Sequence, residues 1–269
     1  MTLLQVHAAA GANLTPVLSE LGGKAPMIVF NDADIEQAVN GTVFGSFVAT
    51  GQTCIAGTRL LVQEDIYEDF VEKYVAKVEK IKIGDPQDPS TQMGPLINAG
   101  QMEKVSEFCV VGKAEGGKIL CGGKPAEGLP AGVKDGHYWH PTVIGDCQPN
   151  MRVVREEVFG PVVVAYPFKD ETDAIEKAND SEFGLAASVW TENIKKAHRV
   201  ADQLDVGIVW LNDHHRNDPS SPWGGMKDSG VGRENGLEAL AEYSQTRSVV
   251  VGFGDDKFDW FQDETQRYG

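Results

Sequence analysis

One cysteine lies between two closely spaced glycines, in residues 51–57 (GQTCIAG). Because glycine permits tight turns, a loop of this kind can hold Cys54 with its sulfur within reach of a substrate. A thiolate is a strong nucleophile, but most cysteines in proteins of alternating strands and helices are inert core residues. The segment alone therefore leaves two interpretations open, a catalytic Cys54 and a structural one.

A glutamate stands in a second unusual setting, in residues 18–24 (LSELGGK). Leucine, glycine and a following apolar run surround Glu20, so its carboxylate should be poorly solvated. Desolvation raises the pKa of a carboxyl group towards neutrality, where a general base works best. The alternative is a glutamate at a strand end that pairs with Lys24.

Taken together, these two segments resemble the aldehyde dehydrogenase family. That family carries the motifs E-L-G-G-K and G-Q-x-C-x-A-G, at the separation that Glu20 and Cys54 have here. Further matches follow in the order of the family, in residues 156–162 (EEVFGPV), 179–185 (NDSEFGL) and 222–234 (PWGGMKDSGVGRE). So many motifs in one order argue against a chance resemblance.

The resemblance implies a role for each of three catalytic residues. Cys54 would attack the aldehyde carbonyl to form a thiohemiacetal, and loss of a hydride would turn this adduct into a thioester. Glu20 would activate the water that hydrolyses the thioester. Glu234 would sit behind Glu20 as a partner in a proton relay, although a surface pair with Arg233 or Lys227 is an alternative for it.

The resemblance also implies NAD or NADP as the cofactor. Glu157 would bind the hydroxyls of the nicotinamide ribose, Phe159 would pack beside the nicotinamide, and Gly22 would belong to the same site. In this family the cofactor-binding domain precedes the E-L-G-G-K motif, and it needs several strand–helix units of roughly 30 residues each. Few residues precede Glu20. We therefore expect most of that domain to be missing from this sequence and the dinucleotide to bind weakly.

The loop of residues 212–221 (NDHHRNDPSS) is unusually polar, and in this family such a loop contributes to substrate specificity. Arg216 could hold a carboxylate, but a pair with Asp213 or Asp218 is favoured. His214 and His215 are adjacent in sequence and should face different directions, so we expect no shared metal site.

Strands and helices must position these residues. Residues 25–30 (APMIVF) and 58–63 (TRLLVQ) predict buried strands, and Asn31 and Asp32 are candidate helix caps. Two amphipathic helices are predicted, because apolar residues recur at positions 35, 39, 43 and 47 and at positions 66, 70, 74, 78 and 81. The second helix should end in the region of Gly84 to Pro86.

The rest of the chain continues the alternation. Residues 84–100 read as a surface loop, and the glycine-rich segment 112–136 should hold little beyond a strand near Ile119. Strands are predicted near 138–144, 162–166, 185–190 and 206–211, and helices over 172–179 and 193–204. This order predicts an α/β fold with a largely parallel sheet flanked by helices.

Composition narrows the class of protein. The chain has 269 residues, 41% of them hydrophobic and 24% charged, which is typical of a soluble globular protein. Its net charge of -16 argues against partners such as nucleic acids and anionic membranes. No apolar run is long enough to span a membrane. The 4 cysteines form no C-x-x-C pair, so we expect a reducing compartment, the cytoplasm.

Residues 246–253 (TRSVVVGF) predict a β-rich arm. The resemblance implies that this arm pairs with a neighbouring subunit in a homodimer or homotetramer, whereas an edge strand within the same chain is the alternative. No role is evident for the tail, 255–269. The expected domains are a remnant of the cofactor-binding domain (1–20), a catalytic domain (21–235), and a C-terminal helix, oligomerisation strand and tail (236–269).

Three functions remain in consideration. The first is oxidation of a small-molecule aldehyde to a carboxylate with NAD(P) as acceptor, impaired if the cofactor domain is missing. The second is a cofactor-independent thiol esterase, since Cys54 and Glu20 could acylate and deacylate without a hydride acceptor. The third is a non-catalytic assembly module with the same fold.

Overall fold

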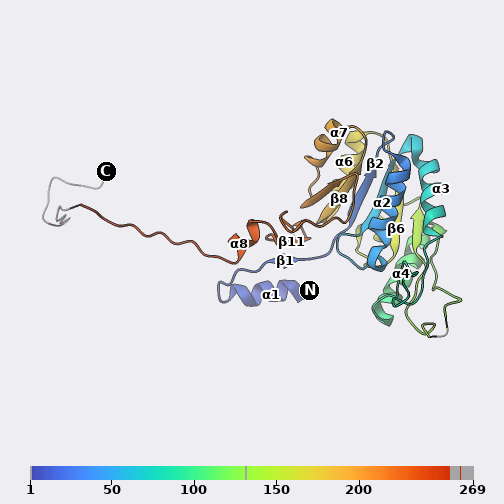
Figure 1. The fold of residues 1–269 in the computed structure, drawn as a ribbon, viewed down its shortest axis with the longest axis horizontal. Helices are drawn as coiled ribbons and strands as arrows, with labels where there is room; N and C mark the ends of the chain where they lie inside the picture. Colours follow the sequence, from blue (N-terminus) through green and yellow to red (C-terminus); the bar gives the residue numbers. More distant parts are fainter. Residues whose placement is uncertain (1, 131, 255–260, 262–269) are drawn as a thin grey trace.

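A seven-stranded sheet forms the centre of the molecule (Figure 1). The computed structural model describes residues 2–130, 132–254 and 261. The order of strands across the sheet is β4-β5-β6-β3-β2-β8-β9, and every neighbouring pair is parallel except β4 and β5. The strands are β2 (Ala25–Val29), β3 (Gly57–Gln63), β4 (Lys118–Cys121), β5 (Thr142–Gly145), β6 (Val162–Phe168), β8 (Ala186–Trp190) and β9 (Ile208–Leu211). The predicted α/β fold with a largely parallel sheet is confirmed.

Helices cover both faces of this sheet. They are α2 (Ile35–Phe47), α3 (Tyr67–Val78), α4 (Ala99–Ala114), α5 (Arg152–Arg155), α6 (Glu171–Asn179) and α7 (Ile194–Ala201), whereas α1 (Thr2–Gly11) and α8 (Glu238–Glu242) lie away from the sheet (Figure 1). Short 3₁₀ helices span Val48–Gly51 and Glu64–Ile66. Two separate clusters of buried side chains show that α2 and α3 pack on one face and α4 to α7 on the other.

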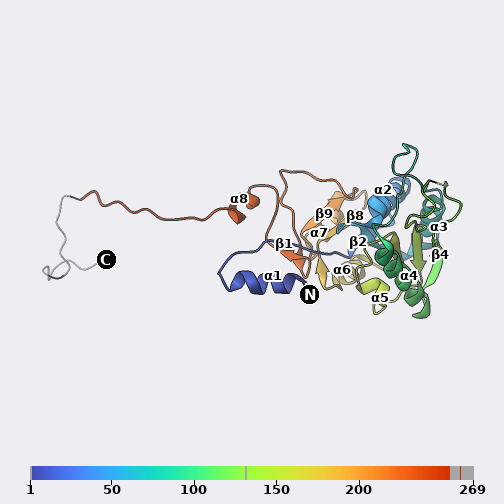
Figure 2. The ribbon, with the colours of Figure 1, turned by 90° about the horizontal axis from the view of Figure 1, so that it is seen from below.

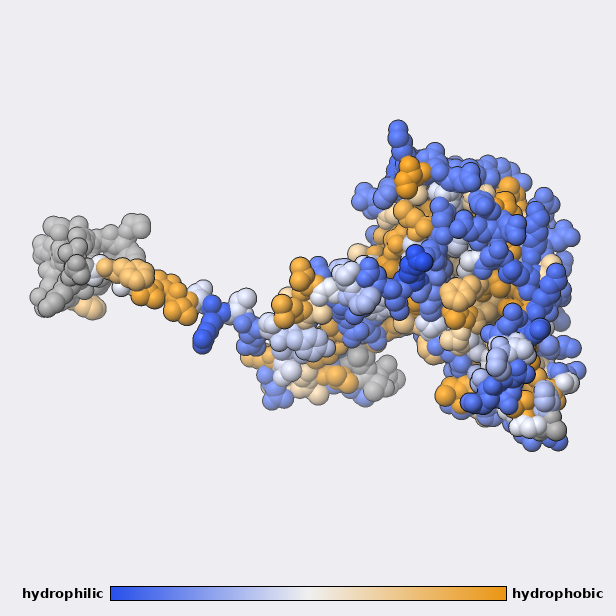
Figure 3. Space-filling view, in the orientation of Figure 1, coloured by the Kyte–Doolittle hydropathy of each residue, from blue (hydrophilic) through white to orange (hydrophobic). Residues whose placement is uncertain are grey.

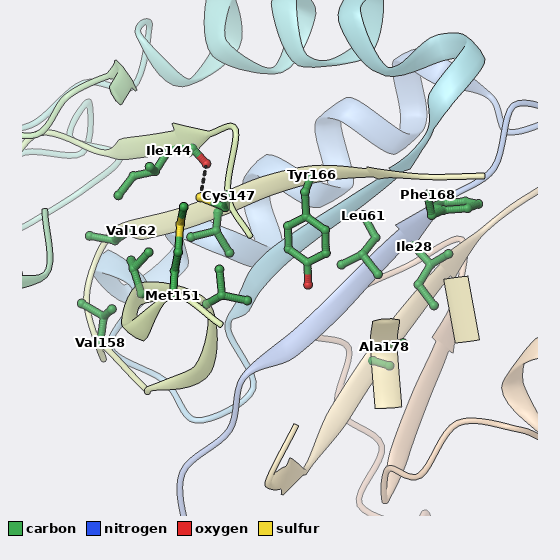
Figure 4. Packing of buried hydrophobic residues seen from close by; sticks show 14 of the residues in the cluster. Ile28, Leu61, Ile144, Cys147, Met151, Val158, Val162, Tyr166, Phe168 and Ala178 are labelled. Carbon is green, nitrogen blue, oxygen red and sulfur yellow. Dashed lines mark hydrogen bonds between the residues drawn. The ribbon is translucent and has the colours of Figure 1, made fainter. Parts of the chain in front are cut away.

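The central strand β2 is formed by the continuous apolar run of residues 25–29. All five of its residues are buried, because helices cover both sides of it. Met27 and Val29 belong to the cluster under α2 and α3, whereas Ile28 belongs to the opposite cluster. Figure 4 shows part of that second cluster, in which Ile28 lies near Leu61 and Phe168.

Helix α4 was not predicted. Residues 84–100 were interpreted as a surface loop and 112–136 as a glycine-rich segment, with no element between them, but the chain is helical from Ala99 to Ala114. Asn98 caps this helix by accepting a hydrogen bond from the backbone N–H of Gln101, at 2.9 Å. Only a narrow stripe of its residues is buried, so the apolar periodicity was weak.

Two helix ends also differ from the prediction. The cap of α2 is Asp34, which accepts from the N–H of Gln37, and not Asn31 or Asp32. Asp32 instead accepts hydrogen bonds from Thr191 and Lys196. The helix expected to reach the Gly84 region ends at Val78, after which the chain turns.

A smaller part of the molecule extends away from the sheet (Figures 1 and 2). It contains α1, α8 and a two-stranded ribbon in which β1 (Ser19–Glu20) pairs with β11 (Gly230–Val231). A second ribbon joins β7 (Phe183–Gly184) to β10 (Met226–Lys227). The β1–β11 ribbon joins the expected remnant of the cofactor-binding domain (1–20) to the expected catalytic domain (21–235). The boundaries between these domains stay a prediction.

The described residues of the C-terminal segment form no strand with the rest of the chain. Residues 244–254 have neither helix nor strand and run out from the body as an extended trace (Figures 1 and 2). The alternative of an edge strand within the same chain is therefore wrong for residues 246–253. Most of the tail, 255–260 and 262–269, lies outside the described residues. None of the helices in the described part of the chain has the length and apolar character needed to cross a bilayer.

Candidate active site

The predicted site residues gather at the amino ends of the parallel strands. The segment with Glu20 leads into β2, the turn with Cys54 leads into β3, and the segment with Glu157 and Phe159 leads into β6. Ligands of open parallel sheets usually bind at the opposite edge, outside the carboxyl ends of the strands. The site therefore depends on the loops that enter the strands, not on those that leave them.

The turn that carries Cys54 has a strained backbone. Ala49, Thr50 and Gly51 are consecutive and all have positive φ angles, of 53°, 62° and 66°. A Cβ atom on Gly51 would lie 2.4 Å from the carbonyl oxygen of Gly160, so only glycine permits this approach. The turn is thus pressed against the segment that carries Glu157 and Phe159, and strain of this kind is common at functional sites.

The Cys54 side chain is half-buried and its thiol is free. Burial raises the pKa of the thiol, and the negative charge of Glu20 raises it further. The backbone N–H groups of Cys54 and Ile55 act in the opposite direction, because they donate towards the sulfur. Cys54 therefore rests as a neutral thiol beside a carboxyl group that can accept its proton.

Glu20 lies at the end of β1 with a half-buried side chain. Neither of its carboxyl oxygens has a hydrogen-bond partner among the described residues. Burial raises the pKa of this carboxyl group and the charge of Glu234 adds to the rise, while Trp223 and Arg233 oppose it. A raised pKa makes the carboxylate a stronger base than an ordinary glutamate, which suits a general base.

A serine that the sequence analysis missed holds the strand that carries Glu20. Ser229 is fully buried, and its hydroxyl donates to the carbonyl of Gly22 at 2.7 Å. The same hydroxyl accepts from the N–H of Gly184, and the Ser229 carbonyl accepts from the N–H of Leu21 at 3.0 Å. The motif around residue 229 thus fixes the motif around Glu20.

The negative charge of Glu234 raises the pKa of Glu20, and the Glu234 side chain is exposed. Its backbone is held by Trp223 through two hydrogen bonds, of 2.6 and 2.7 Å. The alternative surface pairs are not formed in the described part of the chain. Lys227 pairs with Asp205, and the Arg233 guanidinium donates to backbone carbonyls.

Glu157 and Gly22 meet directly. The N–H of Gly23 donates to Oε1 of Glu157 at 2.9 Å, and a Cβ atom on Gly22 would lie 2.4 Å from Oε2. Glycine at position 22 is therefore required for this carboxylate to lie across the backbone. Oε2 keeps acceptor capacity for a hydroxyl group, as the expected contact with a ribose requires.

Phe159 has a positive φ angle of 58°, which is rare for an aromatic residue. Gln101 stabilises this conformation by donating to the carbonyls of Val158 and Phe159, at 2.9 and 2.8 Å. Lys104, one turn further along α4, helps to lower the pKa of Glu157, against the dominant effect of burial, which raises it. Both side chains were missed because α4 itself was missed. The signal that could have found them is the N-x-x-Q cap of residues 98–101.

Two cations are buried behind the site. Arg59 is 2% exposed and donates to the carbonyls of Lys24, Lys177 and Ala178, at 2.8, 3.0 and 2.7 Å. Lys24 is also 2% exposed, and its ammonium group has no hydrogen-bond partner among the described residues. The alternative that Lys24 pairs with Glu20 is therefore not realised.

The polar loop of residues 212–221 contains an ion pair between two of its own residues. Nε of Arg216 lies 3.4 Å from Oδ2 of Asp213, as the favoured interpretation predicted, and its side chain is 81% exposed. His214 is buried and its neighbour His215 is half-buried. The described residues contain no cluster of three or more histidine, cysteine, aspartate or glutamate side chains that could hold a metal ion.

The thiols should differ sharply in reactivity. Cys109, Cys121 and Cys147 are buried, and burial raises their pKa values to about 11, 11 and 12. Cys54 is the accessible thiol of the four, so iodoacetamide should modify it at least ~10-fold faster than the others in the folded protein. Peptide mapping after brief labelling measures this. Equal labelling of all four would exclude Cys54 as the nucleophile.

The chain is similar in sequence to known proteins. The model of the aldehyde dehydrogenase family matches residues 2–249. Proteins named betaine aldehyde dehydrogenase from Brucella anthropi and Brucella melitensis are each 47% identical over 252 residues, which is 93% of this chain and 51% of theirs. The chain thus spans about half the length of the curated relatives it matches.

Solved structures give the same result. A betaine aldehyde dehydrogenase from Staphylococcus aureus, solved in complex with NAD+, has 45% identity and a TM-score of 0.87, over 90% of this chain and 48% of the other. An aldehyde dehydrogenase mutant from Bacillus cereus has 41% identity and a TM-score of 0.88, over 92% of this chain and 49% of the other.

Proposed function

Because the chain belongs to the aldehyde dehydrogenase family, we propose that it carries the catalytic half of an enzyme that oxidises a small aldehyde to a carboxylate. One observation carries the proposal. The half-buried thiol of Cys54 lies beside the unpartnered carboxyl group of Glu20, close enough for the charge of Glu20 to raise the pKa of the thiol. A nucleophile and a base are thereby combined in one site.

The first step belongs to Cys54. Its sulfur bonds to the aldehyde carbon, the carbonyl π electrons move to oxygen, and the thiol proton passes to Glu20. The N–H groups of Cys54 and Ile55, which donate towards the sulfur, stabilise the thiolate before attack. A nicotinamide dinucleotide held by Glu157 and Phe159 would supply the hydride acceptor for oxidation of the resulting thiohemiacetal to a thioester.

The second step belongs to Glu20. Glu20 first releases the proton of Cys54 to solvent. Its carboxylate then takes a proton from water, and the hydroxide adds to the thioester carbon. The carbon–sulfur bond then breaks, which releases the carboxylic acid and restores Cys54. Glu234 is exposed and raises the pKa of Glu20, so we assign it the outer position of a relay that passes this proton to solvent.

The cofactor contacts available in this chain fit only the nicotinamide riboside. Glu157 has a free acceptor oxygen against Gly22, and the side chain of Phe159, two residues later, is half-buried. We propose that these residues hold the ribose and nicotinamide of NAD or NADP. Lys104 and Gln101 support them from α4.

A subunit contact completes the proposal. Val249, Val250 and Phe253 are 76%, 93% and 91% exposed. Figure 3 shows that hydrophobic residues gather along the extended segment. An unpaired apolar segment of this kind favours pairing with another chain. We therefore propose a homodimer or homotetramer in which residues 246–253 add to a neighbouring subunit. The free thiols fit a cytoplasmic location.

A second candidate, a cofactor-independent thiol esterase, is favoured by one fact. Cys54 and Glu20 lie together in this chain, and neither acylation of the thiol nor hydrolysis of the acyl group needs a hydride acceptor. The esterase and the dehydrogenase share the thioester step, so they differ in whether an aldehyde reduces a dinucleotide.

The experiment measures both binding and turnover. The residues proposed to hold the cofactor, Glu157 and Phe159, would contact its nicotinamide end, and ordering a flexible ligand is costly. We therefore expect these 269 residues to bind NAD(P) with a Kd weaker than ~1 mM. At higher dinucleotide concentrations an aldehyde should slowly generate reduced nicotinamide, and Cys54→Ser should abolish this.

Calorimetric titration and the absorbance of the reduced nicotinamide provide the two measurements. Micromolar binding would contradict the expected weak affinity. Absence of any reduction that depends on both aldehyde and Cys54 would contradict the dehydrogenase proposal and leave the esterase.

A further inference from the structure

His214 lies directly behind the turn that carries the nucleophile. Its imidazole is 1% exposed, and Nε2 lies 2.9 Å from the carbonyl oxygen of Ile55, the residue that follows Cys54. Ile55 is itself 2% exposed and belongs to a small cluster with Trp210. A residue of the polar loop is thus hydrogen-bonded to the backbone of the nucleophile turn.

The imidazole ring is held from two sides. The ring centroid of His214 lies 4.8 Å from that of Trp210, at the end of β9. On the other side is α2, where a Cβ atom on Gly45 would lie only 2.6 Å from Cδ2 of His214. The ring therefore has little freedom to rotate away from the Ile55 carbonyl.

The hydrogen bond also fixes the protonation state of the ring. A carbonyl oxygen can only accept, so the proton is on Nε2, and Nδ1 is an unprotonated nitrogen with no partner in the described chain. Burial lowers the pKa of His214 to about 4, and His215 and Asp213 are the titratable groups beside it. The imidazole is thus a neutral donor throughout the physiological range.

We propose that His214 is a positioning residue for Cys54, which acts by holding the Ile55 carbonyl and so fixing the backbone whose N–H groups face the Cys54 sulfur. The inference rests on the proposed function of Cys54. It extends that function by adding a residue that does not touch the substrate. The Ile55 carbonyl belongs to the Ile55–Ala56 peptide, whose N–H donates to the Thr53 carbonyl at 3.0 Å and closes the turn around Cys54. Without the hydrogen bond from His214, this turn would be less restrained, and the thiolate would lose a donor.

The consequence for the thiol has a definite sign. The N–H groups of Cys54 and Ile55 lower the pKa of the thiol, whereas burial, Glu20 and Glu157 raise it. Loss of one donor should therefore move the pH midpoint of Cys54 alkylation upward. At pH 7 the alkylation rate should fall about tenfold, since a hydrogen bond to a charged group is lost.

The test compares His214→Leu with His214→Gln, whose amide N–H can take the place of Nε2–H. His215→Leu is the matched control, because His215 adjoins His214 without bonding to the nucleophile turn. We expect slow alkylation and a raised midpoint in the leucine variant, recovery in the glutamine variant, and no change in the control. Thermal unfolding of each variant is measured in parallel.

Several results would overturn the inference. Equal alkylation profiles for the folded leucine variant and the parent would do so, as would a glutamine variant no better than leucine. If the leucine variant does not fold, nitrogen NMR of the parent decides: a proton on Nδ1 instead of Nε2 contradicts the assignment. Failure of the proposed function looks different, because Cys54 of the parent would then show no preferential alkylation.

Discussion

Replacing Glu20 with glutamine should leave Cys54 able to accept an acyl group but slow hydrolysis of the thioester by a factor of about 10² to 10⁴. Glutamine keeps the size of the side chain but cannot take a proton from water. With an activated ester such as nitrophenyl acetate, the variant should release one equivalent of nitrophenol in a burst. Mass spectrometry should then find the acetyl group on the peptide that contains Cys54.

The pH profile gives a second measure of the same prediction. Burial and then Glu234 raise the pKa of Glu20, and the base form exists only above that pKa. Hydrolysis by the parent should therefore rise with pH through this raised value, whereas the Glu20→Gln variant should lack the rise. Glu36→Gln, on the exposed side of α2, is the control. An unchanged steady rate in the Glu20 variant would rule out its role as the base.

Lys24→Met should make the protein more stable, and the gain should depend on pH. Burial lowers the pKa of Lys24 from 10.5 to about 7, with Arg59 adding to the effect and Glu157 opposing it. Between these two values the unfolded chain holds a proton that the folded chain has lost. Stability of the parent should therefore rise with pH across this window.

The expected size follows from the shift. A charged Lys24 below pH 7 costs the folded protein on the order of 5 kcal/mol relative to an unperturbed lysine, and this cost fades as the pH approaches 10.5. The advantage of the methionine variant should accordingly shrink by about 2–3 kcal/mol between pH 7 and pH 9.

Urea unfolding of both proteins at a series of pH values measures this difference. Lys73→Met, on the exposed side of α3, is the control and should show no such trend. A difference between Lys24→Met and the parent that stays constant from pH 7 to pH 9 would contradict a neutral buried amine.

The sheet could be predicted from local sequence because its signal is local. The run that became β2 is continuously apolar, and Val39, Val43 and Phe47 recur at the spacing of one helix face. Helix α4 escaped because glycines at 100 and 112 weaken its helix propensity and only a narrow stripe of it is buried. For a helix with such a narrow buried stripe, the N-cap residue Asn98 predicts the start of the helix better than apolar periodicity does.

The site was predicted less completely, for a different reason. Cys54 and Glu20 are recognisable because each stands in a distinctive segment. Ser229 and Gln101 act through hydrogen bonds to backbone carbonyls that are far away in sequence. The residue type, serine or glutamine, does not predict such a contact. The same applies to His214, which was considered only as a metal ligand. Long-range contacts to the backbone have no pattern of their own.

The position of the site at the amino edge of the sheet also determines its electric field. Helices α2, α6 and α7 connect parallel strands, so each runs back and ends at this edge. The carboxyl end of a helix carries roughly half a negative charge, which explains why Arg59 is stable on the last carbonyls of α6.

A neutral aldehyde brings no charge into this field, whereas the carboxylate made from it under the proposed function would do so. The product would gain its negative charge beside Glu20, at the edge where these helices end and like charges repel. Burial and the charge of Glu20 raise the pKa of the Cys54 thiol. Under the proposed function, the negative surroundings that disfavour a thiolate at Cys54 should therefore also favour release of the carboxylate product.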